Sequence, residues 1–181
     1  MRSTAKLQAR GFSAVEILLS FLLILALSAV VVPTGRRTIE RSGVSRAEEG
    51  CRAIAEGLIE FVADTGSLPG GDRAPRCWTW LRGPGADCAF EVFPEGRVAE
   101  LDWILVEDGT RIGERWGGPY VEGLQSDPWG RRYVVLLEGR GDDRGARRRV
   151  WVLSAGPDGV IETRPEDSRT VGDDLGLALD L

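Results

Sequence analysis

Histidine is absent from this chain of 181 residues, and cysteine occurs only three times. The absence of histidine excludes the Ser-His and Cys-His pairs of nucleophilic enzymes and every zinc site that uses imidazole. Three cysteines are one too few for an all-thiolate zinc site. Basic charge is also in deficit, because 23 Lys and Arg stand against 28 Asp and Glu. Nucleic-acid-binding proteins usually carry a basic surface, so the composition points to carboxylate chemistry or to no catalysis.

Apolar residues are concentrated near the N-terminus, from Phe12 to Val32, with a single charge at Glu16. A helix needs about 20 mostly apolar residues to cross a bilayer, and this run has that length. The segment before it, MRSTAKLQARG, is basic. A basic segment followed by an apolar run is typical of an export or insertion signal.

Three interpretations of this signal differ in the fate of the chain. The first is cleavage by a secretory peptidase after Ser28, where small residues suit that enzyme, although Glu16 inside the apolar run speaks against it. The second is a single-span anchor, whose orientation stays open because basic residues flank both ends of the run. The third depends on the junction itself, which reads Gly11-Phe12-Ser13-Ala14-Val15-Glu16.

This junction resembles the processing site of type IV prepilins. The resemblance implies a leader over residues 1–11, cleavage after Gly11 and N-methylation of Phe12 by a prepilin peptidase. It also implies that Glu16 is the carboxylate found at this place in the family. A carboxylate in hydrocarbon is costly unless it is paired. We therefore expect Glu16 to pair with the α-ammonium group of Phe12 in a neighbouring subunit of a helical filament.

A long, bent helix is predicted from about residue 12 to residue 65. Its first part, 12–33, is expected to be a transmembrane segment or filament core, and Pro33 predicts a kink or a stop. Its second part, 34–66, has apolar residues at three- and four-residue steps, which is typical of an amphipathic helix packed on a head domain. Gly66 provides a stop signal.

The middle of the chain, 67–118, is a variable loop region rich in Gly and Pro. The spacing of Cys77 and Cys88 suggests a disulfide that closes a small loop in an exported domain. Cys51 lies on the apolar face of the predicted helix and is interpreted as a small buried residue, although a bridge from Cys51 to either of the others stays open. Residues 101–106 are expected to form a short strand.

A second resemblance lies in the region 119–181 and just before it. The strings GGPY at 117–120 and SDPWGRRY at 126–133 resemble the GPY and DPWGxxY signature of the major pseudopilins of type II secretion. The DPWG string is also a turn by its own chemistry, because Pro fixes φ and Gly allows positive φ. Residues 132–138 and 149–153 are strand-like and predict an antiparallel hairpin.

The C-terminal part resembles the calcium loop of the same family, through SAGPDG at 154–159 and Gly172-Asp173-Asp174. The resemblance implies that Asp158, Asp173 and Asp174 supply carboxylates, and that the carbonyl of Leu153 or Ser154 completes the shell. Calcium prefers carboxylate and carbonyl oxygens of this kind. The loop is longer than the usual version, so Glu166 or Asp167 is kept as a substitute ligand.

The expected fold is α+β and pilin-like, with a long N-terminal helix packed on a small antiparallel β-sheet head. The resemblance implies a pseudopilin, which is a non-enzymatic structural subunit of the type II secretion pseudopilus that drives protein export across the outer membrane. Expected partners are further copies of the chain, minor pseudopilins, the assembly platform and prepilin peptidase, but not nucleic acid. The expected location is the bacterial inner membrane, with the head in the periplasm.

Two other functions stay open. A type IV pilin or minor pilin of a surface filament shares the leader and the helix, and the loop with two cysteines fits it, whereas the DPWG string and the acidic loop favour the pseudopilin. A secreted enzyme released after Ser28 would use Asp127 with Asp158 or Glu162 as paired carboxylates. The turn explains Asp127 better.

Overall fold

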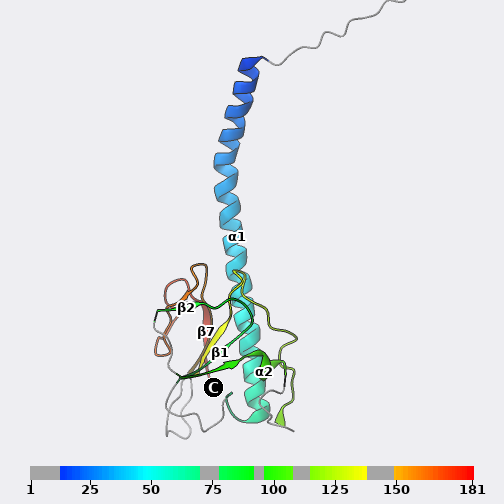
Figure 1. Ribbon diagram of the computed structural model, residues 1–181, viewed down its shortest axis with the longest axis vertical. Coiled ribbons are helices and arrows are strands. Elements are labelled where there is room, and N and C mark those ends of the chain that lie inside the picture. The colour runs from blue at the N-terminus through cyan, green and yellow to red at the C-terminus, as the bar shows by residue number, and fades with distance from the viewer. Residues whose placement is uncertain (1–12, 70–77, 92–95, 108–114, 138–148) are drawn as a thin grey trace, which may run out of the picture. The chain divides into compact units, whose positions relative to one another are not determined.

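The computed structural model describes residues 13–69, 78–91, 96–107, 115–137 and 149–181. The chain consists of two compact units, residues 1–41 and residues 42–181, and each is described by itself. The elements, drawn in Figure 1, are α1 (Ala14–Thr65), β1 (Trp78–Arg82), β2 (Ala89–Phe90), β3 (Gly96–Glu100), α2 (Asp102–Leu105), β4 (Val134–Leu137), β5 (Arg149–Ser154), β6 (Val160–Ile161) and β7 (Leu175–Asp180).

The first unit exposes large apolar side chains on α1. From Val15 to Leu27 their exposed fractions lie between 57% and 70%, and Glu16 is exposed among them. Within the residues that the structure describes, no helix is both long enough and apolar enough to cross a bilayer. The transmembrane segment predicted over 12–33 gains no support from it.

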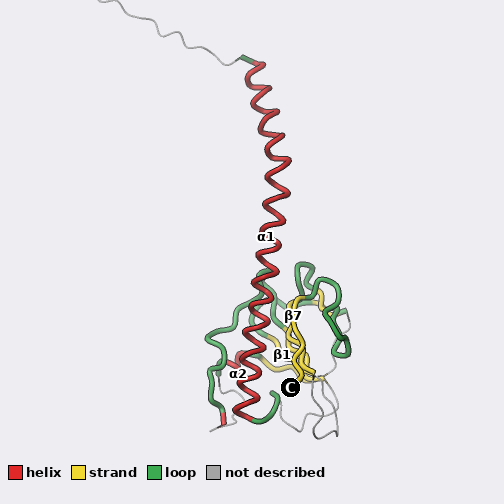
Figure 2. Tube along the Cα trace, turned by 180° about the vertical axis from the view of Figure 1, so that it is seen from behind, coloured by secondary structure: helices red, strands yellow, loops and turns green. Residues whose placement is uncertain are grey.

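The second unit contains a five-stranded sheet in the order β3-β1-β4-β5-β7, shown as yellow strands beside α1 in Figure 2. β4 and β5 run antiparallel with Val134 opposite Leu153, which confirms the predicted hairpin. β1 and β3 run parallel, so the sheet is mixed and the prediction of an antiparallel sheet is wrong at this edge. The reason is β2, which follows β1 and pairs with β6 in a separate two-stranded sheet, so the chain crosses over before β3. The α+β class is confirmed.

Both faces of the sheet are covered by apolar residues, which explains why all four residues of β4 are buried. One face packs against the predicted amphipathic part of α1, whose buried residues here are Cys51, Ile54, Ala55, Leu58 and Phe61. The opposite face carries a second cluster, which consists of Trp80, Val134, Leu136, Trp151, Leu153, Ala155 and Ile161. Phe90 packs edge-on against Trp80 at a centroid distance of 5.3 Å and covers this second cluster.

Residues 102–105 form the short helix α2, and the prediction of a strand over 101–106 is wrong. Leu101, Ile104 and Leu105 are buried, whereas Trp103 is 59% exposed. Burial at steps of three and four residues is the helical pattern. The apolar run was too short to distinguish this pattern from strand alternation by sequence alone.

α1 ends at Thr65, where Gly66 has a positive φ of 72° and its N–H donates to the carbonyl of Val62 at 2.9 Å. A glycine in this conformation is a common helix stop. The hydroxyl of Tyr120 donates to Asp64 Oδ2 at 3.1 Å and accepts from the Gly117 N–H at 2.8 Å. The tyrosine of the GPY string thus holds the end of α1 to the loop before β4.

Two of the three cysteines, Cys51 and Cys88, lie within the described residues, and both are free thiols there. Cys88 is a free, half-buried thiol that packs against the second apolar cluster, and Cys77 lies outside the described residues, so the predicted Cys77–Cys88 bridge finds no support. Cys51 is fully buried, as predicted, and its thiol lies 3.5 Å from the carbonyl oxygen of Leu175. Burial raises the pKa of Cys51 to about 12, so this thiol is an inert core group.

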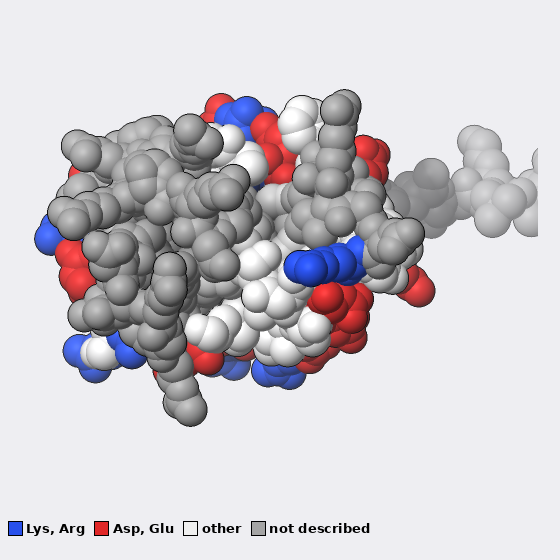
Figure 3. Space-filling model, turned by 90° about the horizontal axis from the view of Figure 1, so that it is seen from below, with Lys and Arg blue, Asp and Glu red and all other residues white. Residues whose placement is uncertain are grey.

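The surface of the second unit carries charges of both signs, which lie side by side around the rim of the face drawn in Figure 3. Arg82 Nε lies 2.7 Å from Glu100 Oε1 and joins β1 to β3, and Arg132 Nε lies 3.0 Å from Asp87 Oδ1. Partly exposed pairs of this kind typically contribute less than about 1 kcal/mol each. The stability of this unit therefore rests mainly on its two apolar clusters.

Tyr133 crosses α1 at Gly50, where the helix has room only for a glycine. A Cβ atom built at Gly50 would overlap the hydroxyl of Tyr133 and lie 2.6 Å from its Cζ. Glycine inside a helix costs about 1 kcal/mol relative to alanine. Close packing of the tyrosine ring therefore outweighs helix propensity at this position.

We predict that Gly50→Ala destabilises the protein by roughly 1–3 kcal/mol, because overpacking outweighs the gain in propensity. Thermal melting of the full chain in detergent measures the change. Tyr133→Phe should restore part of the loss in the double variant. The control is Ala53→Gly at an exposed position of the same helix, which should lose about 1 kcal/mol through propensity alone. A more stable Gly50→Ala protein would contradict the packing argument.

Candidate functional site

The DPWG string forms a tight turn around the buried carboxylate of Asp127, which is 3% exposed. Its Oδ1 accepts from the backbone N–H of Trp129 at 3.0 Å and of Arg131 at 2.7 Å. Gly130 supplies the positive φ, 81°, that closes the turn. The turn predicted from sequence is confirmed, and the aspartate is its centre because a short carboxylate satisfies the N–H groups of its own turn.

The same carboxylate binds a second turn, which follows β5. Asp127 Oδ2 accepts from the hydroxyl of Ser154 at 2.7 Å, and both side chains are buried. Asp127 thus joins residues 126–131 to residues 154–159, and we call these two segments the paired turns. Charge-assisted bonds of this kind are roughly twice as strong as neutral ones.

The guanidinium of Arg131 makes the other link between the paired turns. Nη1 donates to the carbonyls of Gly156 at 2.8 Å and Pro157 at 3.1 Å, and Nη2 donates to that of Asp158 at 3.3 Å. A Cβ atom at Gly159 would overlap this guanidinium. Gly159 also has a positive φ of 81°. Glycine is therefore required at 159 both for the backbone and for the space that the arginine occupies.

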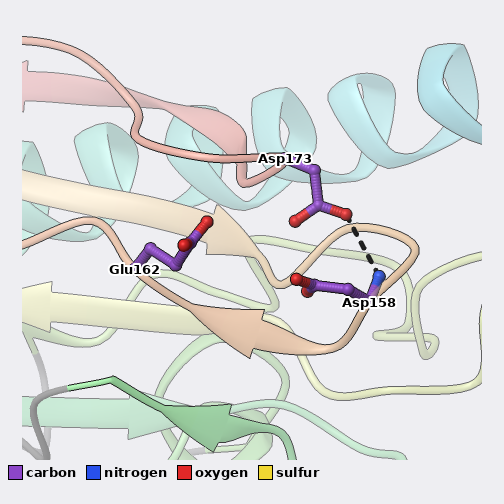
Figure 4. Close-up of side chains that lie close together, drawn as sticks. All are labelled: Asp158, Glu162 and Asp173. Atoms are coloured by element: carbon purple, nitrogen blue, oxygen red, sulfur yellow. Dashed lines mark hydrogen bonds between the residues drawn. The ribbon is translucent and has the colours of Figure 1, made fainter.

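Three carboxylates converge at the end of the paired turns, as Figure 4 shows: those of Asp158, Glu162 and Asp173. One oxygen from each lies within 4.8 Å of the other two. Asp158 comes from the turn after β5, Glu162 follows β6, and Asp173 precedes β7. The N–H of Asp158 donates to Asp173 Oδ2 at 3.1 Å. We call these three residues the acidic cluster.

Asp174, predicted as a ligand, lies next to this cluster and has a structural contact as well. It is 3% exposed, and its Oδ2 accepts from the N–H groups of Glu162 at 2.9 Å and Thr163 at 2.7 Å. Its Oδ1 and the Oδ1 of Asp173 are buried without a hydrogen-bond partner. Two carboxylate oxygens therefore have unused acceptor capacity in a place that water does not reach, which needs an explanation.

The other predicted ligands lie in different surroundings. Leu153 and Ser154 belong to β5, where they pair with Gly176 and Leu175 of β7. Asp167 Oδ2 accepts from the Arg164 N–H at 2.7 Å within its own turn. Among the described residues, neither Asp167 nor Glu166 is part of the group that could hold a metal ion.

The carboxylates of the acidic cluster repel one another. Loss of hydration raises the pKa of Glu162, and the carboxylates of Asp158, Asp174, Glu91 and Asp173 raise it further. Loss of hydration also raises the pKa of Asp174, against the lowering effect of its hydrogen bonds to Thr163 and Glu162. Like charges held this close favour the neutral form of one of them or the binding of a cation.

Space for the acidic cluster depends on glycine as well. Gly172 has a positive φ of 64°, and a Cβ atom there would overlap the carboxylate of Glu162. At Gly156 a Cβ atom would overlap the carbonyl oxygen of Asp173. Gly156 and Gly172 therefore allow the turn after β5 and the segment before β7 to approach each other.

The remaining predicted site residues are at the N-terminus. Gly11 and Phe12, the predicted processing and methylation residues, lie outside the described residues. Glu16 is exposed in the first turn of α1.

One family comparison bears on the chain. A family model described as type II secretion system (T2SS), protein G, matches residues 99–172. No curated protein and no solved structure matches the chain. The matched segment contains the paired turns and Glu162 and stops just before Asp173. The resemblance to the major pseudopilin of type II secretion, protein G, is confirmed by this match.

Sequence reasoning missed two residues of the site. The sequence indicates Glu162 only as one of the paired carboxylates of an enzyme, and it assigns Arg131 no role beyond its place after the DPWG turn. The pairing of Glu162 with the aspartates comes from the short strand β6, whose two residues give little signal. Arg131 directly follows the turn glycine, and only the fold shows that its side chain meets residues 156–158.

We predict that Asp127→Ala destabilises the protein by roughly 2–4 kcal/mol, because it leaves the Ser154 hydroxyl and two backbone N–H groups without their acceptor. Thermal or denaturant unfolding of the full chain measures this change. Asp87→Ala is the matched control, since it removes an exposed carboxylate paired with Arg132 and should cost less than about 1 kcal/mol. Equal effects of the two substitutions would show that Asp127 has no special role.

Proposed function

We propose that this chain is a structural subunit, a pseudopilin, of a type II secretion pseudopilus that drives protein export across the outer membrane. The observation that carries this proposal is the match to type II secretion system protein G over the segment that contains the paired turns. The turn around Asp127 gives the matched DPWG string a physical role, because it organises the loop that follows β5. Growth of the filament, rather than chemistry on a substrate, would provide the function.

Assembly of such a filament is supported by the exposed apolar surface of the first unit. The large apolar residues from Val15 to Leu27 are more than half exposed in the isolated chain. Apolar surface contributes about 25 cal/mol per Å² when it leaves water, so this segment favours lipid or the same segment of neighbouring copies. We propose that copies of the chain form a helical homopolymer through it. Glu16 would then pair with the α-ammonium group of Phe12 in a neighbouring subunit.

The same proposal sets the location and the other partners. Prepilin peptidase would remove residues 1–11 and methylate Phe12. The mature subunit would then reside in the inner membrane with its head in the periplasm. Minor pseudopilins and the inner-membrane assembly platform would then take it into the filament. The match to type II secretion system protein G supports, in general, assembly with other components of that system.

Calcium is the proposed cofactor of the head, and the acidic cluster fits it. Calcium takes six to eight oxygen ligands at about 2.3–2.6 Å, so oxygens on opposite sides of the ion lie roughly 5 Å apart. Carboxylate oxygens of Asp158, Glu162 and Asp173 lie within 4.8 Å of one another. The buried, unpartnered oxygens of Asp173 and Asp174 would also gain a partner. When bound, the ion would supply the positive charge that three carboxylates need to remain together.

We predict that Glu16→Ala leaves a processed, membrane-associated protein that does not assemble, because the charge pair between neighbouring subunits is lost. Cross-linking of subunits in cells and export of the secreted proteins measure assembly and function. Glu40→Ala, at another exposed position of α1, is the matched control and should assemble normally. Normal assembly and export with Glu16→Ala would refute the pairing.

We predict that Glu162→Gln has effects of opposite sign with and without calcium. In chelator it should raise the melting temperature of the full chain, because it removes a charge from a repelling cluster. In calcium it should lower the melting temperature, because a ligand is lost. The control is Glu166→Gln, an exposed position of the same loop, which should change neither value.

The pH dependence of stability in chelator provides a second test of the role of Glu162. The folded-state pKa of Glu162 is raised, so the folded protein binds this proton at a higher pH than the unfolded chain does. Its contribution to stability therefore rises as the pH falls through the raised value toward the usual pKa of about 4.3. Glu162→Gln should remove this contribution. A native protein that melts identically in calcium and in chelator would rule out the calcium site.

A further inference from the structure

Arg131 is the residue whose contacts exceed what its turn requires. Its backbone N–H already binds Asp127 and completes the DPWG turn. Its side chain nevertheless crosses to the turn after β5 and donates to three consecutive carbonyls, those of residues 156–158. Among the hydrogen bonds of the described residues, every acceptor of this guanidinium is a backbone oxygen and none is a carboxylate.

Consecutive carbonyls that point to one place normally need a cation or several donors. The planar fork of a guanidinium supplies both, because it is permanently charged and carries five N–H groups in fixed directions. The side chain of Asp158 stems from this same turn, and its Oδ1 accepts from the Val160 N–H at 2.8 Å. The position of the Asp158 carboxylate in the acidic cluster therefore depends on a turn whose carbonyls Arg131 holds.

We propose that Arg131 acts as an internal cation that forms the turn of residues 156–159 before calcium arrives, and thereby strengthens calcium binding at the acidic cluster. This inference rests on the proposed calcium site. The carbonyls of 156–158 are committed to the arginine, so the ion takes its ligands from the carboxylates. Because Arg131 orders the turn in the calcium-free protein, calcium binding does not have to order it. A ligand that binds an already ordered loop binds more tightly.

The sign of the effect separates this proposal from simple electrostatics. A positive charge near a cation site weakens binding by repulsion, so its removal alone would tighten the binding of calcium. Pre-formation of the turn predicts the reverse. Arg131 is thus a positioning residue, since it contacts the backbone that carries one ligand and not the proposed ion.

The test is a calcium titration of the full chain in detergent, native and variant. Arg131→Ala should weaken the affinity for calcium by about tenfold, as expected if the loop is ordered in about a tenth of the free molecules. Arg131→Lys keeps the charge but loses the planar fork, and it should remain weaker than the native protein. Arg132→Ala is the matched control, because it removes the same charge from the neighbouring residue, which pairs with Asp87 and Glu100 instead. Its affinity should be unchanged.

Hydrogen exchange in chelator tests the turn without calcium. The N–H of Gly159 donates to Ala155 at 3.1 Å and that of Val160 to Asp158. Both should exchange faster in Arg131→Ala than in the native protein and in Arg132→Ala. Unchanged exchange, or calcium affinity in Arg131→Ala equal to or tighter than the native value, overturns the proposal. If the native chain binds no calcium, the proposed cofactor fails, and with it the proposal for Arg131, whatever the exchange shows about the turn.

Discussion

The buried carboxylate of Asp127 is the interaction on which the head depends. A charge without water is costly unless it is fully bonded, and this one accepts from two N–H groups of its own turn and from the Ser154 hydroxyl. It therefore fixes where β4 begins relative to the end of β5. The bond from the Arg131 N–H also sets the starting point of the arginine side chain. The aspartate of a local turn thus also links two segments of the chain, because Asp127 and Ser154 are 27 residues apart.

Beyond this link the structure gathers negative charge that it does not neutralise itself. Arg131 satisfies the backbone carbonyls of the turn, while the carboxylates of Asp158, Glu162 and Asp173 repel one another. Buried oxygens of Asp173 and Asp174 have no partner. Like charges held this close cost stability, and the proposed calcium ion would offset that cost. In the proposed filament subunit, a head stiffened by the ion would resist the forces of assembly.

Local chemistry made much of the fold predictable from sequence. The apolar steps of residues 47–62, Gly66 and the β4–β5 hairpin follow from periodicity and turn residues, and the structure confirms them. The parallel edge of the sheet and the helix at 102–105 were predicted wrongly, because both are decided by tertiary packing. In the acidic loop, Asp158 and Asp173 could be named from motifs. Glu162 and Arg131 could not, because only the fold brings them together.

The proposed function requires that the chain follows the pilin-type route to a filament. The intact mass of the mature protein from a membrane fraction tests this requirement. A pseudopilin subunit would begin at N-methylated Phe12. A chain that begins at Ala29 or Val30 and is found in the soluble fraction would contradict it, because the apolar segment and Glu16 would then be absent from the mature protein.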